Sequence, residues 1–313
     1  MIAIDVAAGV LAERVGDRLR RDEPVGPRTT YRVGGRAALF LDAATVDDLM
    51  AARAAVAASG VPVLVVGKGS NLLVTDDGFP GLAVALGETF AEVTVAATTV
   101  RAGAAAALPV VARRTVAAGL TGFEWAVGVP GSIGGAVRMN AGGHGSDMAA
   151  SLVSIRALDL AGGEDGGVRD VAVAALALGY RRSAITTTTV VLDATLALAT
   201  GDRPAGEAEL ATIVRWRRAH QPGGQNAGSV FTNPPDDSAG RLVEAAGWRG
   251  RRLGTAQVAD KHANFILADP DGRADDVVAL MGAVRAAVRA HSGVDLHPET
   301  IISGHHPELE VES

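Results

Sequence analysis

Cysteine is absent from this chain of 313 residues. Its absence excludes disulfides, thiolate metal sites, iron–sulfur clusters and a flavin attached covalently through sulfur. A chain without cysteine suits a reducing cytoplasm, where we expect the protein to lie.

Several other common signals are also missing. No run of about 18 uncharged apolar residues occurs, which argues against insertion into a membrane. The first residues, Met1–Asp5, lack the basic flank and apolar stretch of a signal peptide. A net charge of −6 argues against a broad nucleic-acid surface. No His, Asp or Glu spacing indicates a metal site, so none is predicted.

The sequence that is present predicts a well-packed globular chain with more than one core. Hydrophobic residues make up 48% and charged residues 20% of the chain, as in soluble globular proteins. A length of 313 residues exceeds one ordinary core and suggests two or three domains.

The spacing of apolar residues, together with glycines at the ends of the predicted elements, predicts an α+β fold that begins with α/β character. In the first part we expect a helix over 5–22, a strand over 37–42, a helix over 46–59 capped by Thr45 and ended by Gly60, and an apolar strand over 61–66. Alternating patterns then predict strands at 91–95, 98–103, 151–159, 168–173 and 188–198, with a helix at 106–118. The segment 201–208, rich in Gly, Asp, Pro and Glu, is predicted to be a linker, followed by helices to 220, over 238–246 and over 274–291, with a strand at 264–268.

A first glycine-rich loop, Gly67–Asn71, follows the apolar strand. Its backbone amides would emerge at the strand's carboxyl end, where α/β sheets bind ligands, and glycine permits close approach to phosphate. Leu72 stands where a dinucleotide fingerprint needs a third glycine, and Val74 continues a strand, so this is not a Rossmann turn. An ordinary strand–turn–strand remains the alternative.

A second loop is richer in glycine, with seven in the 18 positions from 128 to 145. Such spacing indicates backbone wrapped against a flat or anionic ligand, with Ser132 and Asn140 as polar contacts. A flexible linker is the alternative, which the apolar Trp125 and Ile133 disfavour.

Three distant segments each offer one reactive side chain: Arg181, Ser229 and Glu299. A permanent cation, a hydroxyl and a carboxyl group are what is needed to stabilise a developing enolate and then protonate it. Taken singly, each has an ordinary alternative: a surface ion pair, a turn serine and a solvated helix start.

Motifs spread from about residue 27 to 304 resemble one family, the UDP-N-acetylenolpyruvoylglucosamine reductases of bacterial cell-wall synthesis. The matching segments occur in the family's order: Thr29–Gly35, Gly67–Asn71, Pro130–Gly135, Met139–Gly142, Tyr180-Arg181-x-Ser183, Gly228–Pro234 and His297–Glu299. Only 48 positions separate Arg181 from Ser229, which resembles the compact subgroup that lacks an extra substrate-covering loop.

The resemblance implies a two-part FAD-binding domain of the vanillyl-alcohol-oxidase type (PCMH-like), followed by an α+β substrate-binding domain. The expected division is an N-terminal helix at 1–26, FAD-binding subdomains at 27–85 (α/β) and 86–200 (mainly antiparallel β), a substrate-binding domain at 201–304 and a tail at 305–313.

The implied activity is NADPH-driven reduction of UDP-N-acetylglucosamine enolpyruvate to UDP-N-acetylmuramate on non-covalent FAD, in peptidoglycan precursor synthesis. Arg181 and Glu299 would stabilise the enolate and Ser229 would protonate it. The implied FAD contacts are Gly67, Lys68, Gly69, Ser70, Asn71, Leu72, Gly128, Pro130, Gly131, Ser132, Gly134, Gly135, Asn140 and Gly145, and the substrate contacts are Tyr180, Asn233, Arg241 and Lys261. We expect a monomer or weak oligomer.

Two positions depart from the family pattern. Thr232 stands where a lysine is common, and His144 replaces a frequent tyrosine. Two other functions stay open: a sugar or alcohol oxidase on the same flavin fold, and a non-catalytic flavin or nucleotide-sugar binding protein. The intact Arg181, Ser229 and Glu299 argue against the second.

Overall fold

The structure is a computed structural model that describes residues 2–162, 166–306 and 309. The fold is α+β, as the sequence predicts. The described residues divide into two compact units, and neither is continuous in sequence. The first comprises residues up to Arg21, Ala38–Lys68 and Pro80–Arg217, and the second comprises Asp22–Ala37, Gly69–Phe79 and the residues from Arg218 onward. The predicted division into cofactor and substrate domains uses other boundaries and stays a prediction.

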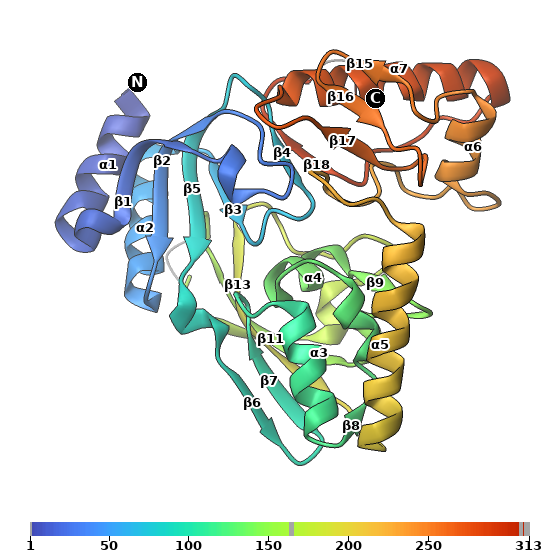
Figure 1. Ribbon diagram of the computed structural model, residues 1–313. Coiled ribbons are helices and arrows are strands. Elements are labelled where there is room, and N and C mark those ends of the chain that lie inside the picture. The colour runs from blue at the N-terminus through green and yellow to red at the C-terminus, as the bar shows by residue number, and fades with distance from the viewer. Residues whose placement is uncertain (1, 163–165, 307–308, 310–313) are drawn as a thin grey trace. The chain divides into compact units, whose positions relative to one another are not determined.

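The first unit begins with helices α1 (Ile2–Val15) and α2 (Val46–Ser59), which lie side by side (Figure 1). Thr45 and Asp48 form a reciprocal capping box at the start of α2, and Gly60 ends it with a φ of +66°. The neighbouring sheet has the strand order β1 (Leu19–Pro24), β2 (Arg36–Ala43), β5 (Phe79–Leu86), β3 (Val63–Val66). Strands β3 and β5 run parallel, which confirms the α/β character of this part.

An antiparallel sheet forms the rest of the first unit, in the order β12 (Arg169–Ala172), β11 (Leu152–Asp159), β13 (Thr189–Ala197), β7 (Thr99–Gly103), β6 (Val93–Ala96). Helices α3 (Leu108–Ala117), α4 (Ile133–Met139) and α5 (Arg203–His220) share one apolar core with this sheet (Figure 1). Short ladders join β8 (Leu120–Thr121) to β14 (Ala199–Thr200) and β9 (Gly142–Gly143) to β10 (Ser146–Asp147).

The second unit has its own core, in which Tyr31, Val33 and Leu73 pack with side chains from the C-terminal third of the chain. Its strands form the antiparallel order β15 (Arg252–Leu253), β16 (Ala256–Val258), β17 (Ile266–Ala268), and a parallel pair of β4 (Leu72–Val74) with β18 (Ile301–Ser303). Helices α6 (Ala239–Ala245) and α7 (Ala274–Ser292) complete it. Within the described residues, no helix is both long and apolar enough to cross a membrane.

Two predicted elements are wrong. The helix expected over 5–22 ends at Val15, where Gly16 takes a φ of +53°, and the chain continues as strand β1. The expected linker at 201–208 is mostly the first turns of α5. There Asp202 accepts a hydrogen bond from the amide of Ala205 at 2.8 Å. Proline is favourable near a helix start, so Pro204 in the first turn of α5 is compatible with the helix. The tail predicted at 305–313 lies largely outside the described residues.

Candidate active site and cofactor pocket

The segments that carry Ser229 and Glu299 run beside each other in the second unit. The amide of Glu299 donates to the carbonyl of Val230 at 2.8 Å, and the amide of Thr232 donates to the carbonyl of His297 at 2.9 Å. An antiparallel bridge joins Phe231 to Pro298 between them. Two of the three predicted catalytic residues are therefore held on adjacent backbone although 70 positions separate them in the sequence.

Asn264 fixes the Ser229 segment from the other side. Its carbonyl accepts from the amide of Val230 at 2.9 Å. Its side-chain Oδ1 accepts from the amide of Phe231 at 3.1 Å, and its Nδ2 donates to the carbonyl of Phe231 at 2.8 Å. Asn264 is only 2% exposed, so these bonds form away from water. Sequence reasoning did not single out this residue, because its partners lie 33 positions away.

Asn71 holds the Glu299 segment in a similar way. Its Nδ2 donates to the carbonyl of Glu299 at 2.9 Å, and its carbonyl accepts from the amide of Ile301 at 3.0 Å. These bonds extend the parallel pairing of β4 with β18. Asn71 was predicted as a cofactor contact, and the structure shows its side-chain amide group positioning Glu299.

The hydroxyl of Ser229 is available for a ligand. The residue is half-buried, and no hydrogen bond to its hydroxyl occurs within the described part of the chain. It follows Gly228, whose φ of +79° turns the chain and whose amide donates to Oδ1 of Asn226 at 3.0 Å. A hydroxyl without a protein partner at the edge of a fixed segment can donate its proton to a substrate.

Arg181 belongs to the first unit, where it sits in a strained turn. Its φ is +55°, a conformation that costs free energy for a side chain other than glycine. Its guanidinium donates to the carbonyl of Gly142 at 3.2 Å and lies 5.1 Å from the centre of the Tyr180 ring. Tyr180 itself is 56% exposed. Residues with strained backbone conformations of this kind cluster at functional sites.

Asn140 is the residue that fixes this turn. Its Nδ2 donates to the carbonyl of Gly179 and to Asp147 Oδ2, both at 3.1 Å, and its Oδ1 accepts from the amide of Ala149 at 3.0 Å. The side chain is 3% exposed, and these three bonds occupy most of its hydrogen-bonding capacity. The predicted contact of Asn140 with the cofactor stays a prediction, whereas its role in holding the segment before Arg181 is visible.

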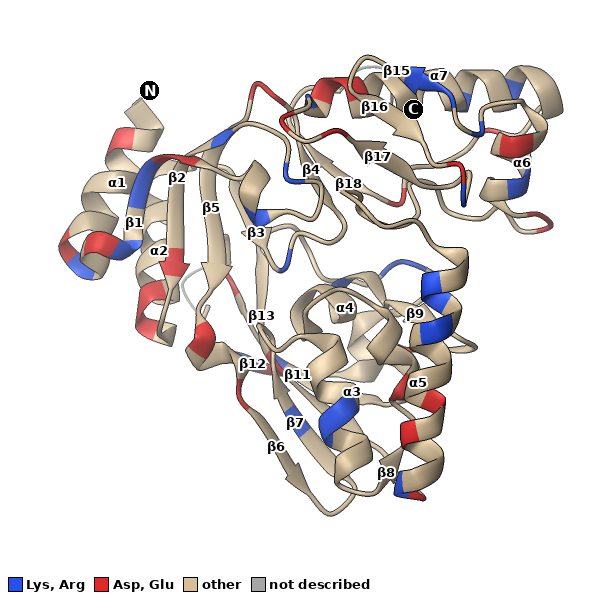
Figure 2. Ribbon diagram, viewed as in Figure 1, with Lys and Arg blue, Asp and Glu red and all other residues tan. Residues whose placement is uncertain are grey.

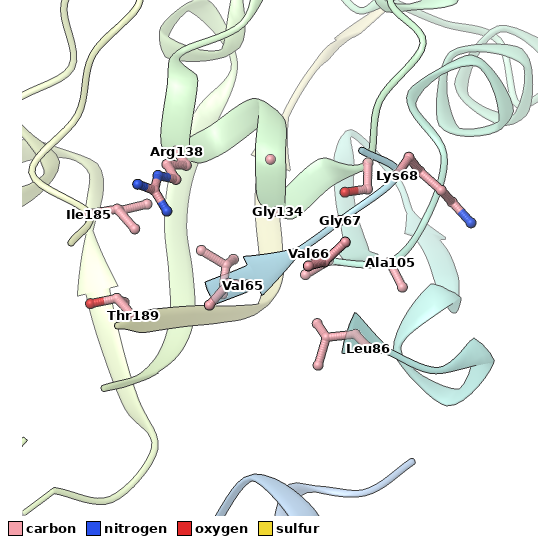
Figure 3. Close-up of a pocket in the computed structure, with 14 residues that line it drawn as sticks. Val65, Val66, Gly67, Lys68, Leu86, Ala105, Gly134, Arg138, Ile185 and Thr189 are labelled. Carbon is pink, nitrogen blue, oxygen red and sulfur yellow. The ribbon is translucent and has the colours of Figure 1, made fainter. Parts of the chain in front are cut away.

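A pocket of about 620 Å³, which includes the part open to solvent, lies in the first unit beside α4 (Figure 3). The pocket brings together five of the predicted cofactor residues: Gly67, Lys68, Ser132, Gly134 and Gly135. The rest of its lining was not predicted and consists of Val65, Val66, Leu86, Ala104, Ala105, Arg138, Ile185, Thr189 and Val191.

The other predicted cofactor residues do not line this pocket. In the first unit these are Gly128, Pro130, Gly131, Asn140 and Gly145, and in the second Gly69, Ser70, Asn71 and Leu72. Gly128 is tightly enclosed instead, because a Cβ there would lie 3.0 Å from Ile213 and 3.3 Å from His144. Contacts of these residues with a cofactor stay predictions.

The predicted substrate residues of the second unit lie near its surface. Oδ1 of Asn233 accepts from the amide of Ala239 at 3.0 Å. Arg241 pairs with Asp237, and this pairing lowers the pKa of Asp237 to about 2. Lys261 donates to the carbonyl of Arg218 at 3.0 Å. Their roles in binding substrate stay predictions, and substrate would have to compete with Asp237 for Arg241.

The two departures from the family pattern have visible contacts. Thr232 donates its hydroxyl to the carbonyl of His297 at 3.3 Å. The imidazole of His144 meets the ring of Trp216 edge-on at 5.1 Å. Burial, with the nearby Arg217, lowers the pKa of His144. Figure 2 shows that Lys and Arg positions gather on the C-terminal half of α5, where the helix dipole favours positive charge.

Comparison with known proteins first defines the class. Residues 37–165 match the family model described as FAD binding domain. The structure of Phl p 4.0202, a glucose dehydrogenase, has a TM-score of 0.50 and 13% identity over 92% of this chain and 63% of that one, which shows a shared fold alone. Together with the glycine-lined pocket, these findings define a flavin-binding fold of the vanillyl-alcohol-oxidase type, as predicted.

The particular family follows from closer relatives. Residues 220–303 match the C-terminal domain model of UDP-N-acetylenolpyruvoylglucosamine reductase. The reductase of that name from Paramagnetospirillum magneticum is 44% identical over 91% of this chain and 92% of its own. The crystal structure of the Thermus caldophilus reductase has a TM-score of 0.78 and 32% identity, covering 92% of this chain and 99% of that one. The chain belongs to the UDP-N-acetylenolpyruvoylglucosamine reductase family.

The residues of the pocket fit FAD. A Cβ on Gly67 would lie 2.8 Å from Oγ of Ser132, and one on Gly134 would lie 3.1 Å from Ala104. The packing thus favours glycine at both positions, and glycine leaves bare backbone to which a diphosphate can approach closely. Val65, Leu86 and other apolar lining residues suit flat rings.

Proposed function

We propose that this protein reduces UDP-N-acetylglucosamine enolpyruvate to UDP-N-acetylmuramate with FAD as cofactor and NADPH as reductant, a step of peptidoglycan precursor synthesis. Reduction of an enolpyruvyl nucleotide sugar is the activity of the family to which the chain belongs. The observation that carries the proposal for this chain is the fixed register of the Ser229 and Glu299 segments. This register holds a hydroxyl and a carboxyl group on adjacent backbone, which supports roles for both in one reaction.

Each catalytic side chain is assigned one task. Bound FAD would supply the hydride that NADPH delivers, which adds to the terminal carbon of the enolpyruvyl double bond. Arg181 stabilises the negative charge that develops on the substrate carboxylate, because a planar guanidinium matches carboxylate geometry. Glu299 adds a hydrogen bond to the same enolate.

Ser229 then protonates the α-carbon. A serine hydroxyl is a weak acid, but an enolate carbon is a strong base, so the transfer is downhill. The proton leaves Oγ of Ser229 for the α-carbon, and solvent returns a proton to the serine. This completes the addition of one hydride and one proton across the double bond.

The decisive experiment measures NADPH oxidation by flavin-loaded protein with and without the enolpyruvyl substrate. Substrate-dependent turnover supports the proposal, and its absence overturns it. Ser229→Ala is expected to leave flavin reduction by NADPH intact while blocking product, and Ser229→Cys should restore part of the product because it keeps an acidic proton. Equal loss of flavin reduction in Ser229→Ala would remove Ser229 as the proton donor.

The same preparation separates the remaining functions. An oxidase of this fold would consume oxygen with a sugar or alcohol, and a flavin retained after denaturation would point to it. A binding protein would hold flavin or nucleotide sugar without turnover.

We also propose that the protein works in the cytoplasm as a monomer or weak oligomer. The absence of cysteine suits a reducing compartment. Light scattering on the eluting flavoprotein tests the oligomeric state, and cell fractionation tests the location.

A further inference from the structure

The cofactor pocket contains one cation that sequence reasoning did not assign. Arg138 lies in the last turn of α4 and lines the pocket together with Ile185 and Thr189. Figure 3 shows these three residues at one side of the pocket, with Lys68 and Ala105 at the other. Lys68 is exposed, whereas Arg138 is only partly exposed. The two cations therefore differ in how much water they keep.

Within the described part of the chain, the guanidinium of Arg138 has no counterion. Among the residues that the structure describes, none forms a hydrogen bond or ion pair with it. Burial lowers the pKa of Arg138, which reflects the lost hydration of its charge. A partly desolvated guanidinium without an anion costs free energy, and this cost is offset when an anion binds.

The backbone around Arg138 is nevertheless well fixed. Its carbonyl accepts a hydrogen bond from Oγ of Ser183 at 2.6 Å, and the amide of Ile185 donates to the same Oγ at 3.2 Å. The end of helix α4 is thus tied to the segment that carries Ile185, on the same side of the pocket. A guanidinium held on such a support is preorganised for a ligand.

We propose that Arg138 is a cofactor-binding residue of this chain whose guanidinium pairs with the diphosphate of FAD. This inference rests on the proposed function, because it takes FAD as the ligand. The diphosphate is the anionic part of FAD, and a planar fork of N–H groups matches phosphate oxygens. The apolar lining suits the rings, which leaves the charge of Arg138 for the phosphates.

The test titrates the full chain, freed of flavin, with FAD and separately with riboflavin, which has the ring but no phosphate. Arg138→Met is expected to weaken FAD binding by about ten- to a hundredfold, the range of a hydrogen bond to a charged group. Arg138→Lys should lose less affinity for FAD, because lysine keeps the positive charge but lacks the planar set of N–H groups. Riboflavin binding should be unchanged in both variants. The difference in FAD affinity between the wild type and Arg138→Met should narrow at high salt.

Arg113→Met is the matched control, because Arg113 is an exposed arginine of the same unit whose guanidinium donates to the carbonyl of Pro109 within its own helix. It should bind FAD like the wild type. Unchanged FAD binding in Arg138→Met overturns the inference. An equal loss of riboflavin binding also overturns the inference, because that result would place Arg138 at the flavin ring. Thermal melting shows whether the variant is folded.

The two proposals fail in different ways. If the wild type binds no FAD, the proposed function fails and this inference fails with it. If the wild type binds FAD and reduces the substrate while Arg138→Met binds FAD equally well, the inference alone fails.

Discussion

Replacement of Asn264 by alanine should damage the second unit and the catalytic segment together. The substitution removes both side-chain hydrogen bonds to Phe231, whose side chain is fully buried. Each buried backbone group left without a partner costs about 1–3 kcal/mol. The variant should therefore lose about 2–6 kcal/mol of unfolding free energy.

The consequence for catalysis follows from the position of Ser229, two residues before Phe231. A displacement of about 1 Å can cost about a hundredfold in rate, so kcat should fall by about ten- to a hundredfold while FAD binding in the first unit changes little. Urea unfolding and steady-state kinetics measure the two effects. Gln257→Ala is the control, because Gln257 lies on β16 of the same unit and its side chain bonds to Arg252 and Gly250 near the surface. It should lower the free energy of unfolding by less than about 1 kcal/mol. An unchanged urea midpoint and turnover in Asn264→Ala would refute the positioning role.

Two further predictions concern stability. Gly34→Ala should lower the free energy of unfolding by more than about 3 kcal/mol, because its Cβ would lie 2.2 Å from the carbonyl oxygen of Val74 at a φ of +116°. Gly60→Ala is the control. Its φ is +66° and the space around it is open, so it should lower the free energy of unfolding by only about 1 kcal/mol. Hydrogen bonds from the amide and hydroxyl of Thr255 lower the pKa of Asp276, so its stabilisation is present above about pH 4 and is lost as the pH falls through the lowered pKa. Urea titrations should therefore show Asp276→Asn less stable than the wild type at pH 7, and the difference in unfolding free energy should shrink in acid. A difference that grows in acid would contradict this prediction.

Local signals in the sequence predicted elements whose ends are set by neighbouring residues. Helix α2 was predicted with its exact bounds, because Thr45 and Gly60 act on the residues beside them. Strand β1 was missed because its charged residues lack the alternation of apolar and polar side chains that predicts a strand. Its pairing with β2 also depends on residues farther along the chain. The glycine at position 16 was the local signal in the sequence that could have corrected the helix end.

The same limit applies to the candidate site. Motif order predicted the glycine side of the pocket, since its glycines lie in recognisable short segments. It also named the three candidate catalytic residues, whose roles stay predictions. Leu86, Ile185 and Thr189 also line the pocket, but they come from two different sheets and a loop that only the tertiary fold brings together. Arg138 lay inside the predicted glycine-rich region, but no motif distinguishes an unpaired arginine from a paired one. The confirmed family and fold therefore rest on local motifs, whereas the pocket wall needed the structure.

The discontinuous second unit has a consequence for how the chain folds during synthesis. Tyr31, Val33 and Leu73 leave the ribosome early, yet the core they fill is supplied mainly by residues after 226. Strand β4 must likewise wait for β18, the last strand described. The early segments are therefore exposed until translation is nearly complete. A fragment that starts near residue 218 would lack three side chains of its own core, and we expect it not to fold alone.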